Sequence, residues 1–134
     1  MPEELIRRYF VAFNAGDSAG MLGCLADDVV HDVNQGERRH GKAAFRTFLA
    51  HMARCYQEQL RDIVVMTAPS GARAAAEFVV HGRYLVTDPG LPPATGQTYV
   101  LPAGTFFAID DRRISRVTTF YNLRAWLAQV GGDG

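Results

Sequence analysis

The sequence has no excess of charge of either sign and no long apolar run. Its 134 residues include 14 basic and 14 acidic side chains, and like charges do not gather in one stretch. We expect no nucleic-acid partner, because proteins that bind phosphates present a basic stripe. No apolar stretch approaches the roughly 20 residues of a membrane-spanning helix, and the first residues do not read as a signal peptide. These absences favour a cytoplasmic protein without a membrane partner.

Cysteine is also scarce, and the chain has only Cys24 and Cys55. Both lie in stretches expected to be helical, and neither belongs to a pattern with metal-ligand spacing. His31 and Asp32 are neighbours in one expected strand, so they face opposite sides, and no His-x-x-x-His pattern occurs. The sequence therefore predicts two reduced thiols, no metal site and no cofactor.

The first half of the chain has the hydrophobic periodicity of helices. Apolar residues recur at three-to-four spacing in 3–14 and again in 42–57, which predicts two amphipathic helices with one buried face each. A glycine followed by an aspartate predicts a helix C-cap and a new N-cap, so a short helix is expected over 17–25. Alternating apolar and polar residues predict a strand at 29–34.

The second half is rich in expected strands, which lie at 60–66, 72–87, 99–109 and 114–121. A closing helix is expected over 122–130, with a frayed end at 131–134. Helices followed by hairpin-linked strands are typical of an α+β domain. We expect residues 1–134 to form a single such domain, a cone-shaped, curved antiparallel sheet with three N-terminal helices packed on its concave face. The first and third of these helices are expected to cover the face, and two helices alone cannot fill such a curve, so the cone should enclose a pocket.

Short motifs in both halves resemble a known superfamily. Tyr9 is followed five residues later by Asn-Ala-Gly-Asp at 14–17, and then by Ala-Asp-Asp at 26–28 and a strand that carries an acid. Gly90–Gln97 resembles the glycine- and proline-rich loop of SnoaL-like proteins. Together these motifs resemble the ketosteroid isomerases and the SnoaL-like polyketide cyclases of the nuclear-transport-factor-2-like superfamily. The likeness extends over most of the chain and indicates the fold more specifically than the function.

The resemblance implies two catalytic residues. Tyr9 matches the tyrosine that donates a hydrogen bond to an enolate oxygen, and Asp32 corresponds to the aspartate that moves the proton. A strict count from Ala26–Asp28 places Val33 at the aspartate position, so Asp32 matches only with a deletion or bulge, because a one-residue shift exchanges strand faces. The alternatives are a core aromatic at Tyr9 and a solvent-facing acid at Asp32. The isomerases' second acid has no counterpart in Pro102–Thr105.

Further residues are expected to line the pocket. Asn34 shares a strand face with the expected base, whereas His31 is placed outside the pocket. His81 and Arg83 share one face of the long strand, and an unperturbed histidine titrates near neutral pH. Asn122 stands where SnoaL-like proteins often carry an acid, and its amide can orient a ligand. The predicted substrate-binding residues are Asn34, Phe48, Met52, Tyr56, His81, Arg83, Phe106 and Asn122.

Two functions of different classes fit these residues. The first is a cofactor-independent proton-transfer enzyme, of isomerase or cyclase type, that acts on a small apolar carbonyl compound. The second is a non-catalytic module of the same fold that binds a small molecule or dimerises. The resemblance also implies a homodimer, because the sheet face that no helix covers is expected to be buried against another copy.

Overall fold

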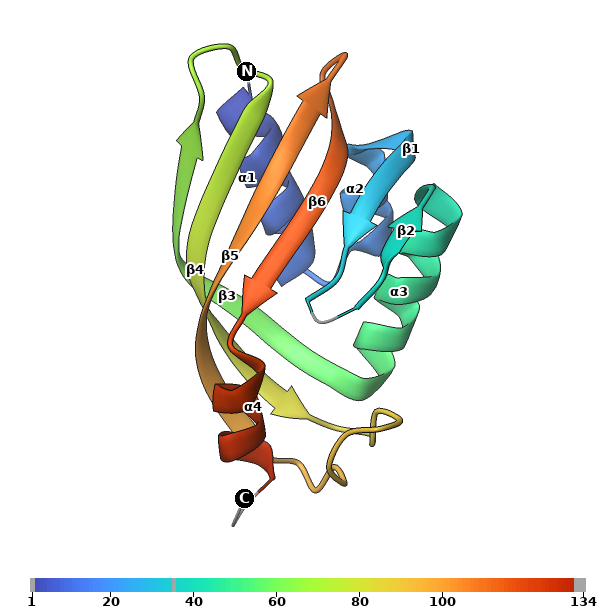
Figure 1. The fold of residues 1–134 in the computed structure, drawn as a ribbon, viewed down its shortest axis with the longest axis vertical. Helices are drawn as coiled ribbons and strands as arrows, with labels where there is room; N and C mark the ends of the chain where they lie inside the picture. The colour runs from blue at the N-terminus through green and yellow to red at the C-terminus, as the bar shows by residue number, and fades with distance from the viewer. Residues whose placement is uncertain (1, 35, 132–134) are drawn as a thin grey trace.

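The structure is a computed structural model that describes residues 2–34 and 36–131. Figure 1 shows a strongly curved sheet that wraps around helices on its concave side. The class predicted from the sequence, α+β with a curved sheet, is confirmed. In chain order the elements are α1 (Pro2–Asn14), α2 (Ser18–Gly23), β1 (Leu25–Asp32), β2 (Arg38–His40), α3 (Lys42–Cys55), β3 (Tyr56–Thr67), β4 (Arg73–Tyr84), β5 (Thr98–Asp110), β6 (Arg113–Tyr121) and α4 (Leu123–Val130). Most of the end predicted to fray, 132–134, lies outside the described residues.

The six strands lie in the order β2-β1-β6-β5-β4-β3. The hairpin-linked strands are antiparallel as expected, but β1 runs parallel to β6. The sequence prediction did not include this parallel pair, because no turn joins the two strands and only a turn would fix their relative direction. It also missed β2, a three-residue strand whose side chains are all exposed.

Within the curved sheet, β3 changes register against β4. A bulge lies between Arg61 and Val64, and within it Asp62 adopts a positive φ of 56°. Aspartate tolerates the left-handed region better than most residues, and a bulge bends its strand and increases the twist. The bend carries the start of β3 towards α3, which leaves space between the sheet and the helices.

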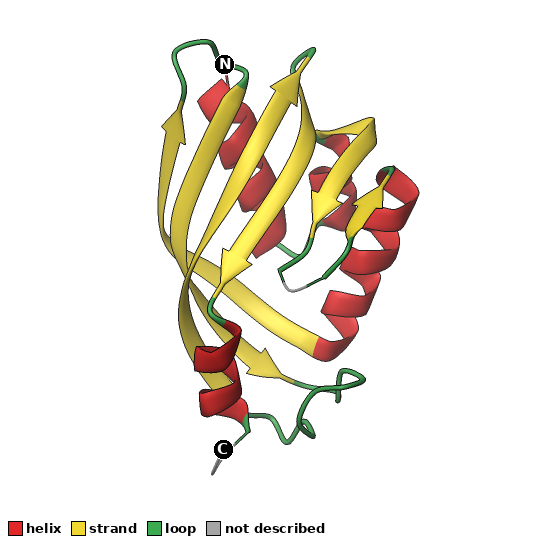
Figure 2. Cartoon of the chain, viewed as in Figure 1, coloured by secondary structure: helices red, strands yellow, loops and turns green. Residues whose placement is uncertain are grey.

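Helices α1, α3 and α4 border this space, and α2 reaches it with Met21. α1 buries the apolar stripe that its periodicity predicted, and Phe10 contacts Phe78 and Phe107 with ring centroids 5.4 and 5.9 Å apart. α3 buries Phe45 against the opposite part of the sheet. Figure 2 shows α4 below the end of β6 and beside the lower part of the sheet, where the ring centroids of Trp126 and Tyr84 lie 5.2 Å apart. The helices therefore border the concave space without filling it.

No helix in residues 2–34 or 36–131 has the length and apolar character needed to cross a membrane.

Candidate active site

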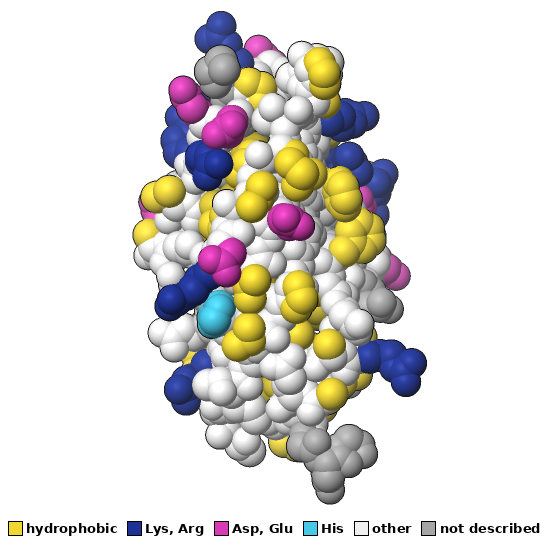
Figure 3. Space-filling view, turned by 90° about the vertical axis from the view of Figure 1, so that its left-hand side faces the viewer, with side chains coloured by type: hydrophobic (Ala, Val, Ile, Leu, Met, Phe, Trp, Pro, Cys, Tyr) yellow, Lys and Arg dark blue, Asp and Glu magenta, His cyan; other side chains and the backbone are white. Residues whose placement is uncertain are grey.

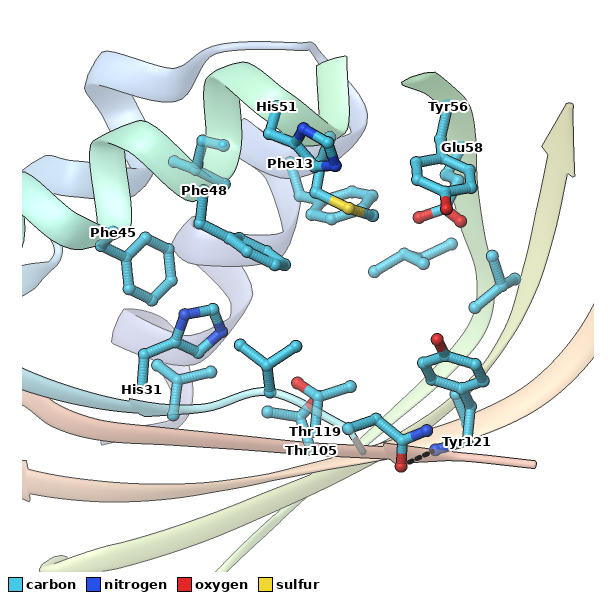
Figure 4. A pocket seen from close by; sticks show the side chains of 18 of the residues that line it. Phe13, His31, Phe45, Phe48, His51, Tyr56, Glu58, Thr105, Thr119 and Tyr121 are labelled. Atoms are coloured by element: carbon cyan, nitrogen blue, oxygen red, sulfur yellow. Dashed lines mark hydrogen bonds between the residues drawn. The ribbon is translucent and has the colours of Figure 1, made fainter. Parts of the chain in front are cut away.

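A cavity of about 580 Å³ lies between the concave face of the sheet and the helices. Most of its lining is apolar, and its ionisable side chains gather in two regions (Figure 4). We call the region around His31, Phe45 and Phe48 the β1 end. We call the region around Glu58 and Asp88, with their hydrogen-bonding partners, the β3 end.

His31 dominates the β1 end. It projects from β1 beneath two phenylalanine rings, with centroid distances of 4.4 Å to Phe45 and 4.6 Å to Phe48 (Figure 4). The residue is only 5% exposed, and its Nδ1 atom has no hydrogen-bond partner in the described part of the chain. Burial, helped by the charge of Arg39, lowers the pKa of His31 to about 4, so the ring is neutral at neutral pH. Because no protein group fixes the tautomer through Nδ1, the other ring nitrogen can either accept or donate a proton.

Asp32 lies on the outer face of β1 and does not line the cavity. Its carboxylate accepts hydrogen bonds from Arg38 Nε at 2.6 Å and Nη2 at 3.0 Å, and from Thr118 Oγ1 at 2.7 Å. The hydrogen bonds from Arg38, and to a lesser extent that from Thr118, lower the pKa of Asp32 to about 2 against the opposing effect of burial. The prediction that Asp32 points into the cone is therefore wrong.

The prediction that His31 lies outside the pocket is also wrong, because it exchanged the inner and outer faces of β1. β1 begins at Leu25, four residues earlier than predicted, and Val29 and His31 form its inward face. A one-residue offset exchanges the two faces of a strand, so the histidine takes the place expected for the acid.

Tyr9 lies in the cavity wall on α1. It is 6% exposed, and its ring meets Phe10 and Phe107 edge-on at centroid distances of 5.6 and 5.7 Å. Burial raises the pKa of Tyr9 well above its ordinary value, and the neighbouring Cys24 adds to this shift. The phenol therefore stays protonated and remains a hydrogen-bond donor. Its role towards an enolate stays a prediction.

Four of the predicted substrate-binding residues also line the cavity, namely Asn34, Phe48, Met52 and Tyr56. The Oδ1 atom of Asn34 accepts a hydrogen bond from the backbone N–H of Tyr121 at 3.3 Å, drawn as a dashed line in Figure 4. Its Nδ2 atom is buried and has no partner among the described residues. A buried, unpaired amide donor is costly unless water or a ligand satisfies it.

His81 and Arg83 do not line the cavity. Both are exposed on the outer face of β4, whereas the cavity-lining residues of this strand are Phe78 and Val80. The sequence prediction chose the polar face of the strand as the inner one. The apolar face is inside instead, because it is the one that packs against α1.

Phe106 and Asn122 also lie away from the cavity. Phe106 is 50% exposed on the outer face of β5, because its neighbour Thr105 faces inward on the alternating strand. Asn122 is the N-cap of α4, where its Oδ1 atom accepts a hydrogen bond from the backbone N–H of Ala125 at 3.1 Å. Its amide is therefore used in starting the helix.

Glu58 is an acid of the β3 end that the sequence analysis missed. It lines the cavity, and the Tyr99 hydroxyl donates a hydrogen bond to its Oε2 atom at 2.5 Å. Burial raises the pKa of Glu58, although the bond from Tyr99 opposes this shift. Tyr99 reaches across the strand at Gly82, where a Cβ atom would lie only 2.2 Å from its ring. Because the strand was predicted to begin at residue 60, the inward position of residue 58 could not be recognised.

Asp88 is the second acid of the β3 end. It stands in the loop after β4 and accepts a hydrogen bond from the Tyr56 hydroxyl to Oδ2 at 2.6 Å. Its Oδ1 atom lies 2.9 Å from Nε2 of His51, which in turn is 3.9 Å from Cys55 Sγ. Cys55 and Cys24 are both buried and form no disulfide.

The SnoaL-like domain family matches residues 6–117 of the chain. The chain belongs to this family, and the resemblance to SnoaL-like proteins noted in the sequence is confirmed. None of the curated proteins is similar enough to the chain to count as a match.

Solved structures agree with this assignment. A candidate polyketide cyclase from Pseudomonas putida KT2440 is 58% identical, with 97% of this chain and 98% of that chain covered and a TM-score of 0.96. A second, from Silicibacter sp. TM1040, is 55% identical over 96% of this chain and 94% of that chain, with a TM-score of 0.95. An NTF2-like protein from Burkholderia xenovorans LB400 shares the fold at 14% identity, with coverage of 96% and 95% and a TM-score of 0.77.

Proposed function

We propose that the protein is a cofactor-independent proton-transfer enzyme, of cyclase or isomerase type, that acts on a small apolar carbonyl compound. The observation that carries this proposal is His31, a neutral base buried in the wall of an apolar cavity, whose Nδ1 atom has no hydrogen-bond partner within residues 2–34 and 36–131. An apolar cavity with a few polar groups is the usual form of a small-molecule site. The similarity to candidate polyketide cyclases supports the same reaction class.

In this proposal His31 takes the role that the sequence analysis gave to Asp32. The ring nitrogen that faces the cavity removes a proton from the carbon next to the carbonyl group, which leaves an imidazolium and an enolate. The imidazolium then returns the proton at another carbon in an isomerisation, or to the new alkoxide after the enolate has closed a ring. A pKa of about 4 suits this task, because the aspartate base of ketosteroid isomerase works with a pKa of about 4.6.

Tyr9 is the proposed donor to the enolate oxygen. Its phenol stays protonated because burial raises its pKa, and a hydrogen bond to developing charge is stronger in an apolar cavity than in water. The Nδ2 amide of Asn34, which no described residue pairs, is the proposed donor to a second oxygen of the substrate.

Hydrogen exchange tests the proposal directly. A panel of cyclic enones and 1,3-diketones is incubated with the protein in D₂O, and the loss of the α-hydrogens is followed by NMR. Trp126 is the only tryptophan of the chain and lines the cavity, so its fluorescence reports binding of the same compounds. We expect exchange of at least one bound probe without any added cofactor.

Two neighbouring substitutions separate catalysis from general damage. His31→Gln should reduce the exchange rate by about 10²- to 10⁴-fold, the usual contribution of a general base. Asp32→Asn changes the next residue, on the outer face, and should leave the rate within a few-fold. Undiminished exchange in His31→Gln would rule out its role as the base. Binding without exchange by any probe would instead favour the non-catalytic binding module.

We also propose a homodimer that pairs the outer faces of two sheets. Three apolar side chains of the outer face are each at least 50% exposed, namely Val100, Phe106 and Phe120. The ring centroids of Phe106 and Phe120 lie 5.9 Å apart. Figure 3 shows hydrophobic side chains along the middle of the molecular face on the left-hand side of Figure 1. Light scattering should give twice the chain mass at micromolar concentration. A monomer there, or an unchanged dimer in Phe106→Asp, would count against this interface.

A further inference from the structure

Three metal-ligating side chains come together beside the β3 end of the cavity. His51 and Cys55 are one turn apart on α3, and Asp88 belongs to the loop after β4. One nitrogen, one sulfur and one oxygen of these residues all lie within 4.8 Å of one another. His51 and Asp88 line the cavity, whereas Cys55 is only 1% exposed behind them.

Hydrogen bonds alone cannot pair all three of these side chains with one another. Asp88 Oδ1 and Cys55 Sγ both approach the same atom, Nε2 of His51, at 2.9 and 3.9 Å. A ring nitrogen carries either one hydrogen or one lone pair, so it can make one good hydrogen bond in that direction. A relay of the Cys–His–Asp kind would use the two different ring nitrogens. A cation between the three donor atoms, by contrast, is attracted to all of them.

The residues are held in place independently of any ion. The backbone carbonyl of Cys55 accepts hydrogen bonds from the N–H groups of Leu85 and Val86, at 2.8 and 3.3 Å, which ties the end of α3 to the loop. The backbone N–H of Asp88 donates to the Tyr84 hydroxyl at 2.9 Å. Residues that are 33 positions apart in the sequence are thus fixed next to each other.

The orientation of the carboxylate is fixed as well. The Tyr56 hydroxyl donates to Oδ2 of Asp88, which leaves Oδ1 directed at His51. Tyr56 and Tyr84, whose hydroxyls hold Asp88, also stack on each other, with ring centroids 5.4 Å apart. Outer hydrogen bonds of this kind are what orients the carboxylate ligands of known metal sites.

We propose that His51, Cys55 and Asp88 form a zinc site at the wall of the cavity. A thiolate, a neutral imidazole and a carboxylate together carry two negative charges, which match Zn²⁺, and all three are usual zinc ligands. Bonds of about 2.0–2.3 Å require only small movements of the donor atoms, which replace the contact between His51 and Asp88. Three protein ligands leave the fourth position for water or a ligand oxygen from the cavity.

A sequence signal for this site existed but was passed over. His51 and Cys55 are four residues apart, and on a helix this spacing places two ligands on the same face. The prediction of no metal site rested on the spacing of the cysteines, on the neighbours His31 and Asp32 and on pairs of histidines, and it did not take a histidine together with a cysteine. The third ligand is 33 residues further on, so no local pattern could have shown it.

Cobalt substitution tests the site without reference to catalysis. The purified, metal-free protein is titrated with Co²⁺, whose bond to a thiolate gives a near-ultraviolet charge-transfer absorption. We expect this absorption to saturate at one Co²⁺ per chain and to disappear when Zn²⁺ is added. Cys55→Ser should abolish it. Cys24→Ser, at the other buried cysteine, is the matched control and should retain it.

A second variant guards against misfolding of Cys55→Ser. The side chain of His51 is 41% exposed, so His51→Ala should fold normally and still lose tight Co²⁺ binding. No thiolate absorption in the unsubstituted protein, or an unchanged absorption in Cys55→Ser, would overturn the proposal. Because the ligands do not include His31 or Tyr9 and the readout is a spectrum, this result is independent of the proton-transfer proposal.

Discussion

The two ends of the cavity surround their ionisable groups differently, with aromatic rings at the β1 end and hydrogen-bond donors at the β3 end. At the β1 end, His31 lies among aromatic rings, and its Nδ1 atom has no partner in the part of the chain that the structure describes. At the β3 end, Glu58 and Asp88 each accept a hydrogen bond from a tyrosine, at 2.5 and 2.6 Å. At the first end burial is the main cause of the lowered pKa of His31, and at the second end hydrogen bonds hold the two acids in a network.

This difference separates two tasks. A group without protein partners has its proton and its lone pair free for a ligand, which suits a base that takes up and returns a proton. A group inside a network has a fixed direction and little freedom to exchange its proton, which suits a residue that holds something in place.

The largest effect is expected from removing the aromatic wall of the β1 end. Phe45 is 1% exposed, and Phe45→Ala should lower the free energy of unfolding in urea by about 3–5 kcal/mol. Water entering the space should also raise the pKa of His31 towards its ordinary value, visible by NMR titration. Val11→Ala is the control on α1, where the side chain is 69% exposed, and should cost far less. Equal losses in both variants would contradict the packing described for His31.

The second largest effect is expected in the pH dependence of stability, and the buried His31 is its cause. Because burial lowers the pKa of His31 to about 4, the unfolded chain binds a proton between pH 4 and about 6.5 that the folded chain does not. Stability is therefore complete above pH 6.5 and falls as the pH drops towards 4, by a total of about 3 kcal/mol. Urea unfolding at several pH values measures this fall. His31→Gln should flatten it, whereas His81→Asn on the outer face should retain it.

At the β3 end, Gly82→Ala should disturb the network through Tyr99. The new methyl group would collide with the tyrosine ring, and overpacking of this kind costs about 1–3 kcal/mol. The hydrogen bond to Glu58 should weaken as the ring moves. Gly23→Ala is the matched control, because a Cβ atom there meets nothing within 4 Å. Thermal unfolding that does not distinguish the two variants would contradict the close crossing of Tyr99 over β4.

The smallest effect concerns the charges beside His31. The charge of Arg39 lowers the pKa of His31 and that of Asp32 raises it. Arg39→Gln should therefore raise this pKa, and Asp32→Asn should lower it further. NMR titration of the His31 ring gives both shifts, and shifts of the same sign would show that these charges do not act through space as described.

The fold was largely readable from the sequence, because periodicity and turn residues mark most elements directly. Asp17 caps α2 as predicted, with its side chain accepting a hydrogen bond from the N–H of Gly20. The bounds of α1 differ from the prediction by one residue. The inner face of β1 could not be read in the same way, because Val29 and Val30 are both apolar and either face could be the inner one.

The site was harder to predict than the fold. The prediction took the wrong face of β1 as the inner one, so it placed Asp32 in the cavity and His31 outside. It also took the polar face of β4 as the inner one, so it counted His81 and Arg83 among the cavity residues. The hydrogen bonds of the β3 end join residues 32 and 41 positions apart, Tyr56 to Asp88 and Glu58 to Tyr99. Contacts of this range depend on the bend in β3 and on a loop conformation, neither of which leaves a local pattern in the sequence.

The parallel pairing of β1 with β6 has a consequence for folding. His31 lies opposite Val117, and Thr118 bonds to Asp32 across a separation of 86 residues. Contacts between such distant segments form slowly, because a long loop must close before they contribute any stability. The proposed base should therefore reach its position only in the last stage of folding, when β6 docks beside β1. Intermediates that lack this docking would contain helices and hairpins but no competent cavity.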